Sequence, residues 1–528
     1  MTTINRNDLR IQNAENLIKS FDVEGHNAYL FLSKPTQWET DIVATTMPRY
    51  EAGDNSPQKP DNSWKEFYSV YDEMLSMSKL TRSNAKLLLP RLRWTSGIIY
   101  DMYRHDYNEV RRTYSNATHL YDSVFYVINA RREVYVCLDN NNNSQSLVEP
   151  NTTAIDSEPF YTSDGYQWLY LYTVPLSEFR ENSTNNFIPV STISMNYIPP
   201  GGVYTVVIES RGSKYTVNPD GIFNTDRDSY YYFCNIVGDG RDGIAKVKVF
   251  NNEIIEVRVI SPGEGYTYAK LDFTPNRVYQ NLEDLFAEEN GLNPLGDNTF
   301  RSSVIITPPE GWGSESEDEF EGEVAIARQL GGTRVGLFLR TQQNEKDPDF
   351  LREIMFRQVG LIQDVEFLST SITSTTDPND PSVLYEVSVT DDNSETSFIP
   401  GETIYQFIDD INDPNRKYIA KGVVVDSKTT IDSYGNTTIS IQYIQKPQLH
   451  TINTLLVGEK YFDYNMYEFE GDSNIIGDTS GKSCKANPDS YVTPQYKPYS
   501  GKITYLANLQ PVQRDPNQTE RISLIISY

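Results

Sequence analysis

Apolar and polar residues alternate along most of this chain, with two stretches of helical periodicity near its start. Alternation predicts strands with one buried face, and it is clearest at residues 123–129, 133–139 and 166–175. Asp8 is predicted to cap a first helix, whose apolar residues are Ile11, Ala14, Leu17, Ile18 and Phe21. A capping box of Ser63 and Glu66 predicts a second helix, with an apolar face of Trp64, Phe67, Tyr68, Tyr71 and Leu75. Residues 1–200 therefore read as an N-terminal α+β core region.

An internal repeat follows residue 200. The segments VVIESRGSKYT (206–216) and VRVISPGEGYT (257–267) are similar, and Tyr266 follows Tyr215 by 51 residues. Each copy reads as a strand, a glycine turn at Gly212 or Gly263, and a Tyr-Thr pair that opens another strand. We expect positive φ at both glycines, which a β-branched residue adopts only at a cost. Residues 201–332 are therefore interpreted as an inserted β module, which includes an exposed acidic loop at 308–323.

The remaining chain alternates between two kinds of segment. Residues 333–367 are interpreted as a return to the core, with strands at 333–342 and 356–367 and a short helix at 347–354 that Asp347 caps. Residues 368–490 are interpreted as a second inserted module, because VLYEVSVT, ETIYQFI, AKGVVVDS and TTISIQYI are short strands spaced as in an all-β barrel or sandwich. Residues 491–528 are expected to close the core with a last strand, whose buried side carries Ile522, Leu524, Ile526 and Tyr528.

These segments predict a fold that is mainly β with some α (α+β). It is a discontinuous antiparallel β-sandwich core interrupted by two inserted β modules.

The net charge of the chain disfavours some classes of binding partner. The 528 residues include 46 basic and 73 acidic side chains, a net charge of −27, which opposes binding to nucleic acid and to anionic lipid. No segment approaches the ~18 consecutive apolar residues of a membrane helix, and the first residues do not resemble a signal peptide. We therefore expect synthesis in the cytoplasm, no membrane insertion and no nucleic-acid partner. The 37 tyrosines favour strands and surfaces that become buried in an assembly.

Candidate chemistry is scarce. The four histidines and three cysteines are scattered, and no metal, nucleophile or phosphate-binding motif is present. The segment GDGRDG (238–243) has a faint likeness to a calcium loop but lacks its alternating ligands and closing Glu, so it is interpreted as a glycine-rich turn. We expect no catalytic, cofactor-binding or metal-binding residues and no enzymatic activity.

Several separated segments resemble one family. YLFLSKPTQWETD (29–41) carries Pro35 and Trp38, and LLPRLRWTSGIIYD (88–101) carries Pro90, Arg91, Trp94 and Tyr100. FYVINARREVYVCLDN (125–140), SDGYQWLYLYTVP (163–175) and FRQVGLIQDVEF (356–367) follow in the same order. The closing segment 499–528 contributes Ser500, Gly501, Tyr505, Asn508, Pro511, Gln518, Thr519 and Glu520. Together they resemble the baseplate wedge subunit of T-even-type contractile-tailed bacteriophages, the gene product eight family. The stretches 201–332 and 368–498 have no counterpart in its compact members.

The resemblance implies an architectural role. Family members are homodimeric structural proteins of the virion that join wedge partners of the gene product six, seven and ten types. Six wedges surround the tail hub, and the baseplate rearranges at infection. On this interpretation the protein is assembled into the tail baseplate, and Trp38, Trp64, Trp94 and Trp168 are aromatic anchors of the core.

Other functions stay open from the residues alone. A tail-associated polysaccharide depolymerase requires a pair of carboxylates facing a groove lined by aromatic residues. A receptor-binding fibre protein is expected to be a trimer with longer repeats. An unrelated multidomain β protein is a further alternative.

Overall fold

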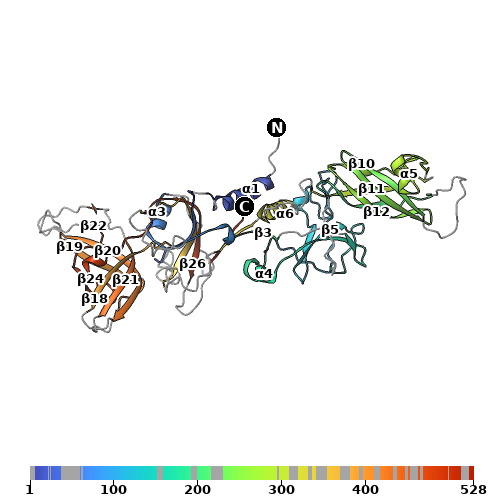
Figure 1. Cartoon of the computed structure of the whole chain (residues 1–528). Helices are drawn as coiled ribbons and strands as arrows, with labels where there is room; N and C mark the ends of the chain where they lie inside the picture. The colour runs from blue at the N-terminus through green and yellow to red at the C-terminus, as the bar shows by residue number, and fades with distance from the viewer. Residues whose placement is uncertain are drawn as a thin grey trace. The chain divides into compact units, whose positions relative to one another are not determined.

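The computed structural model describes most of the chain (Figure 1). The described residues are 6–21, 23, 25–36, 60, 64–151, 159–191, 199–215, 230–293, 296–308, 319–330, 336–340, 354–368, 381–391, 397–409, 417–431, 437–445, 450–451, 462–463, 468–497, 499–512 and 522–527. The protein is mainly β with antiparallel sheets and some helix, which confirms the predicted fold class. The chain divides into two compact units. Unit 1 comprises Met1–Asn16, Lys86–Phe338 and Ile525–Tyr528, and unit 2 comprises Leu17–Ala85 and Leu339–Leu524.

Unit 1 contains one sheet built from the aromatic strands near residue 130. Its order is β4-β5-β7-β6, from Tyr126–Ile128, Glu133–Asp139, Gln167–Thr173 and Phe160–Tyr161. The first three confirm the strands predicted there. The short helices η2 (Leu120–Asp122) and α4 (Leu176–Asn182) flank these strands in sequence.

The repeat region of unit 1 forms sheets of its own. β9 (Val203–Ser210) pairs with β15 (Arg301–Ile306). A second sheet contains β10 (Tyr230–Gly238), β11 (Arg241–Phe250), β12 (Glu253–Glu264), β13 (Ala269–Leu271) and β14 (Val278–Tyr279), and the helix α5 (Leu282–Ala287) follows. GDGRDG contains the tight turn between β10 and β11, formed by Asp239 and Gly240, as interpreted from its glycines.

The two copies of the repeat have similar surroundings. Gly212 and Gly263 have φ of 60° and 61°, which confirms the predicted positive φ. A Cβ at either glycine would lie against the ring of the tyrosine three residues later, 2.6 Å from Tyr215 Cε2 or 2.7 Å from Tyr266 Cε2. Both tyrosine side chains are buried in one hydrophobic cluster. Each glycine therefore makes room for the ring that anchors its own turn.

One acidic segment of unit 1 differs from the prediction. Residues 308–323 were expected to form an exposed loop, but α6 spans Glu319–Leu330, so 319–323 are helical. Val324, Ala327 and Leu330 recur at helical spacing and are buried. Glu323 is also buried, and its Oε1 lies 2.9 Å from Lys86 Nζ. The helical periodicity on the C-terminal side of the acidic run therefore decides the local structure. Residues 309–318 lie outside the described part of the chain.

A further sheet contains the last strand. Its order is β27-β16-β3-β8, from Ser523–Ser527, Gly336–Arg340, Ala85–Pro90 and Phe187–Pro189. Ile522 and Leu524 are buried, which confirms the predicted buried side there, and Ile526 is half-buried. Tyr528 lies outside the described residues.

Unit 2 contains a sheet assembled from three distant parts of the sequence. Its order is β2-β1-β17-β26, from Met74–Lys79, Ala28–Ser33, Phe356–Gln363 and Lys502–Val512. Leu361 of the central strand pairs with Leu30 on one side and with Tyr505 on the other. Gly360 lies beneath the ring of Phe31, where a side chain would collide with that ring. The short helix η1 spans Arg82–Asn84.

A closed barrel forms the second part of unit 2, shown in orange in Figure 1. Its strand order is β18-β21-β20-β19-β24-β25, from Tyr385–Asp391, Thr437–Gln445, Lys417–Ile431, Thr403–Asp409, Asn474–Gly477 and Ser483–Ala486. The four strands predicted in this region are confirmed. The short pair β22 (His450–Thr451) and β23 (Phe462–Asp463) and the helix η3 (Pro488–Ser490) complete the unit. The boundaries predicted for the inserted modules stay predictions.

The two predicted N-terminal helices are present, with corrections. α1 spans Arg6–Ser20 and buries Ile11, Ala14 and Ile18, but it begins two residues before Asp8, which is therefore not the N-cap. α3 spans Trp64–Asp72, so Leu75 belongs to β2 and not to the helix. Tyr68, which was assigned to the apolar face, is half-exposed. Val70, which was not assigned to it, is fully buried. Ser63 and residues 347–353 lie outside the described part of the chain.

Candidate functional site

The tryptophans expected to anchor the core have different positions. Trp168 of β7 is fully buried, stacks on Tyr166 with 5.5 Å between ring centroids, and meets Tyr100 edge to face. Trp94 is partly buried against the same cluster. Trp38 lies outside the described residues, and the same holds for the side chain of Trp64. The core role is therefore confirmed for Trp168, and Trp94 contributes at the edge.

Within the described residues, no group of three or more His, Cys, Asp and Glu side chains is arranged to hold a metal ion. Likewise, none of the described helices combines the length and the apolar character needed to cross a membrane.

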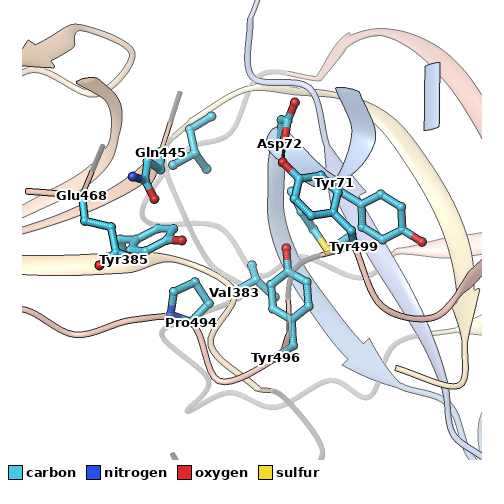
Figure 2. A pocket seen from close by; sticks show the side chains of 11 residues that line it. Tyr71, Asp72, Val383, Tyr385, Gln445, Glu468, Pro494, Tyr496 and Tyr499 are labelled. Atoms are coloured by element: carbon cyan, nitrogen blue, oxygen red, sulfur yellow. Dashed lines mark hydrogen bonds between the residues drawn. The ribbon is translucent and has the colours of Figure 1, made fainter. Parts of the chain in front are cut away.

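Unit 2 contains a pocket of about 230 Å³, which we call the tyrosine pocket (Figure 2). Its walls come from the end of α3, the start of β2, the start of β18 with Val383 before it, the end of β21, and the residues Glu468, Pro494, Tyr496 and Tyr499. The lining residues are Tyr71, Asp72, Met74, Val383, Tyr385, Ile444, Gln445, Glu468, Pro494, Tyr496 and Tyr499. Four of these eleven are tyrosines.

Tyr499 is held in place by a strained turn. Its backbone has φ of 61°, in the left-handed region that non-glycine residues rarely adopt. Such strain costs about 1–3 kcal/mol and persists where surrounding contacts enforce it. Here Ser500 N donates to Lys497 O at 3.1 Å, and Ser500 Oγ accepts from Glu366 N at 3.1 Å. The turn is therefore fastened to the segment that follows β17.

Hydrogen bonds link Tyr499 and its neighbours to α3. The Tyr499 hydroxyl donates to Asp72 Oδ1, and the Tyr71 hydroxyl donates to Gly501 O at 3.0 Å. The rings of Tyr71 and Tyr499 lie 5.7 Å apart. Burial, together with the bond to Asp72, raises the pKa of Tyr499 above its ordinary range. The Tyr499 hydroxyl is therefore a proton donor that ties its side chain to the end of α3.

The opposite wall belongs to the barrel. Tyr385 stacks on Tyr443 with centroids 5.6 Å apart, and Tyr443 meets Phe469 edge to face at 4.8 Å. Burial and the neighbouring Glu468 carboxylate raise the pKa of Tyr385 to about 12. Figure 2 shows Tyr385, Glu468 and Gln445 on one side of the pocket and Asp72, Tyr71 and Tyr499 on the other.

Gln445 is the unusual polar residue of the pocket. Only 5% of it is exposed, and no described group accepts a hydrogen bond from its Nε2. A buried donor without a partner costs about 1–3 kcal/mol. Gln445 lines the pocket, but its Nε2 is itself buried and Figure 2 shows it turned away from the pocket.

A second hollow adjoins the tyrosine pocket. It has a volume of about 550 Å³ and is lined by Phe67, Tyr68, Tyr71, Tyr499, Gly501, Lys502 and Ile503. Tyr71 and Tyr499 line both hollows. Tyr68 is half-exposed, and its ring lies 5.5 Å from that of Tyr499. An extended molecule could therefore occupy both hollows across these shared rings.

Sequence reasoning missed this pocket and directed attention to the tryptophans. The abundance of tyrosine was its one signal, and composition does not say which rings meet. Tyr71, Tyr385 and Tyr496 come from distant parts of the chain, so no local motif joins them. The pocket brings together four tyrosines and two carboxylates, Asp72 and Glu468.

Two comparisons with known proteins were made, and neither found a match. A scan against protein-family models found no match, and a search of curated proteins found none either.

Proposed function

We propose that this protein is a structural subunit of the baseplate wedge of a contractile-tailed bacteriophage. The observation that carries the proposal is the meeting of the family-like segments in one sheet. β1, β17 and β26 fall in the three separated parts of the sequence that resemble the wedge subunit, and they are neighbours in the order β1-β17-β26. If the three segments belong to one core, as the resemblance implies, they are expected to pack together in this way.

Residues that carry the resemblance also make the contacts between these strands. Asn508 Oδ1 accepts from Gln358 Nε2 at 2.9 Å, and the same Nε2 lies 2.8 Å from Glu66 Oε1. Ser500 Oγ accepts from Glu366 N at 3.1 Å. A Cβ at Gly501 would lie 2.8 Å from Gln363 O, so glycine allows the close approach. The closing segment thus fits the segment 356–367 in detail, which supports a shared ancestral core.

The two stretches without a counterpart in the family are also consistent with the proposal. The barrel has its own hydrophobic cluster, as does the repeat region. Elements that bury their own apolar residues can be added to a scaffold without rebuilding it.

The proposed role needs several protein interfaces and no chemistry. We propose that the protein forms a homodimer and joins wedge subunits of the gene product six, seven and ten types. It would be made in the host cytoplasm and reside in the virion, at the tail baseplate, whose rearrangement at infection it shares. A tyrosine-rich surface suits such contacts, because Tyr combines a large ring with a polar hydroxyl.

The proposal is tested on purified virions. Gold-labelled antibody against residues 381–491 should mark the baseplate in electron micrographs, and the co-expressed chain should copurify with the wedge partners. A virus lacking this gene should yield no functional tails. Label on tail fibres or on the capsid, or absence of the chain from the virion, would contradict the proposal.

One observation favours the depolymerase as a second candidate. The tyrosine pocket has the aromatic lining and two carboxylates, Asp72 and Glu468, that such an enzyme needs. Asp72, however, already accepts the Tyr499 hydroxyl, so its carboxylate is engaged in holding the wall. Release of reducing sugar from host polysaccharide, abolished by both Asp72→Asn and Glu468→Gln, would favour the enzyme over the wedge subunit. A trimeric mass would instead favour a fibre.

A further inference from the structure

The sheet of β10, β11 and β12 in unit 1 leaves part of its outer face exposed (Figure 1). Alternate residues of a strand point to opposite sides of its sheet. One side, with Cys234 and Val247, is buried in the hydrophobic cluster of the repeat region. On the other side Phe233 packs against a small cluster that contains Leu285 of α5, whereas Tyr231 is 41% exposed. The part of the sheet around Tyr231 is therefore accessible to a partner.

Two lysines of β11 gather over the exposed ring of Tyr231. The Nζ atoms of Lys246 and Lys248 lie 4.2 and 5.6 Å from its centroid. Arg258 of β12 is the cross-strand neighbour of Lys246, and its side chain is exposed. We call Tyr231, Lys246, Lys248 and Arg258 the basic face. It is a local concentration of positive charge on a chain whose net charge is −27.

The two lysines form no ion pair with a carboxylate among the residues that the structure describes. Glu256 is opposite Lys248 in the register of the strands, but its Oε1 lies 3.2 Å from Arg258 Nη2. Other cations of the same region do have glutamate partners: Arg211 with Glu253, Arg241 with Glu264, and Arg277 with Glu288. Ammonium groups that lack a carboxylate attract a partner of opposite charge.

The geometry of the basic face favours an acidic peptide. Lys246 and Lys248 are two positions apart on one strand, so their side chains start roughly 6.8 Å apart, and acidic residues at alternate positions of an extended peptide have the same spacing. A single-stranded nucleic acid needs an open aromatic face for its bases, but the Lys246 ammonium already covers a face of Tyr231. The net charge of −27 also repels a long polyanion.

We propose that the basic face binds an extended acidic peptide segment of a partner protein. The peptide runs across the face with carboxylates at alternate positions, which accept hydrogen bonds from the ammoniums of Lys246 and Lys248. Arg258 adds a third positive charge at the side of β12. Tyr231 holds the two ammoniums in place before the peptide arrives. This binding is independent of the proposed role in the wedge, since it requires only an acidic partner.

The first experiment measures binding to the full chain by fluorescence anisotropy. The probe is a labelled peptide of roughly eight residues in which Glu and Thr alternate, and the control probe has Gln in place of Glu. We expect a dissociation constant of about 100 μM or tighter at about 50 mM salt, and binding about tenfold weaker at about 300 mM salt, because salt screens exposed charges.

Three results of this experiment would overturn the proposal. They are the absence of binding by the Glu peptide up to about 1 mM, equal binding of the Gln peptide, and tighter binding of an oligothymidylate that carries the same charge. The last result would assign the basic face to a nucleic acid.

Variants then locate the site. Lys246→Gln combined with Lys248→Gln should weaken binding of the Glu peptide about tenfold or more. Lys270→Gln combined with Lys428→Gln removes the same charge from two exposed lysines outside the basic face, and this matched control should bind within about twofold of the native chain. Full binding by the first variant, or an equal loss in the control, would overturn the proposal.

Reversing the charge separates binding from folding. Lys246→Glu combined with Lys248→Glu should lose the Glu peptide and bind a peptide in which Lys and Thr alternate, because the charges of both partners are exchanged. A variant that had failed to fold would not gain this preference. A charge-reversed variant that has the circular dichroism spectrum of the native chain and still prefers the Glu peptide would contradict the assignment of these lysines.

Discussion

At the scale of single residues, two glycines near the second repeat differ in the room available for a side chain. Gly263 has φ of 61°, and a Cβ there would lie 2.7 Å from Gly243 N and against the ring of Tyr266. Gly265, two residues later, has φ of 72° but meets nothing within 4 Å. An alanine at either position would have an unfavourable positive φ, but only at Gly263 would its Cβ also collide with neighbouring atoms.

This difference makes a matched pair of substitutions. Gly265→Ala should lower the free energy of unfolding by about 1–2 kcal/mol, the cost of a left-handed backbone. Gly263→Ala should add about 1–3 kcal/mol of overpacking to that cost. Thermal and urea unfolding of both variants measures the difference. Equal effects would mean that the turn around Tyr266 relaxes freely, contrary to the packing described here.

Asp106 gives a prediction that depends on pH. Burial alone would raise the pKa of its carboxyl, but Arg104, bonded at 2.9 and 3.0 Å, and Arg111 outweigh it and lower the pKa from 3.8 to about 2. Because the folded pKa is depressed, the stabilisation is present above pH 3.8 and is lost as the pH falls towards 2. Solvent screening reduces it to about 1 kcal/mol, since the side chain is partly exposed.

Asp106→Asn should therefore be less stable than the native chain at pH 6, by about 1 kcal/mol, and the difference should shrink as the pH falls through about 2. Urea unfolding across this pH range measures both values. A difference that stays constant with pH would show that the carboxylate charge plays no part.

At the scale of elements, the short strand β27 is expected to contribute much of the stability of its sheet. It is the edge strand of the order β27-β16-β3-β8; Leu524 within it and Ile522 just before it are buried. A Leu→Ala change in a core costs about 2–5 kcal/mol, against a typical domain stability of about 5–15 kcal/mol. Losing the strand would also leave β16 as an unpaired edge, which invites aggregation.

Leu524→Ala should therefore lower stability by about 2 kcal/mol, towards the lower end of that range because the strand lies at an edge. Deleting residues 522–527 should sharply reduce the soluble yield. Ser523→Ala, on the exposed side of the strand, should change stability by less than about 0.5 kcal/mol. Circular dichroism and the soluble fraction on expression are the measurements. A deleted chain that still unfolds cooperatively at the native temperature would show that β27 is dispensable.

The elements also show what the sequence can predict. Alternation identified β18, β19, β20 and β21 because each strand buries one face within a few residues. α6 was not predicted, because the acidic residues that precede Val324 indicated an exposed loop. The pocket could not be predicted, since Gln445 and Tyr499 belong to one site only through tertiary packing. Pairing of β1 with β17 is equally invisible to a local pattern.

At the scale of the whole molecule, the order β2-β1-β17-β26 constrains how the chain is made. Ser33, at the end of β1, precedes Phe356, at the start of β17, by more than 300 residues. At roughly 5–20 residues per second, a ribosome needs about 16–65 s to synthesise the intervening chain. β1, whose residues are all buried in the finished sheet, must wait through that interval with only β2 beside it. The nascent chain thus exposes an apolar strand for many seconds, a state that chaperones recognise. Growth temperature and chaperone supply should therefore limit the yield of this protein more than the stability of its finished fold does.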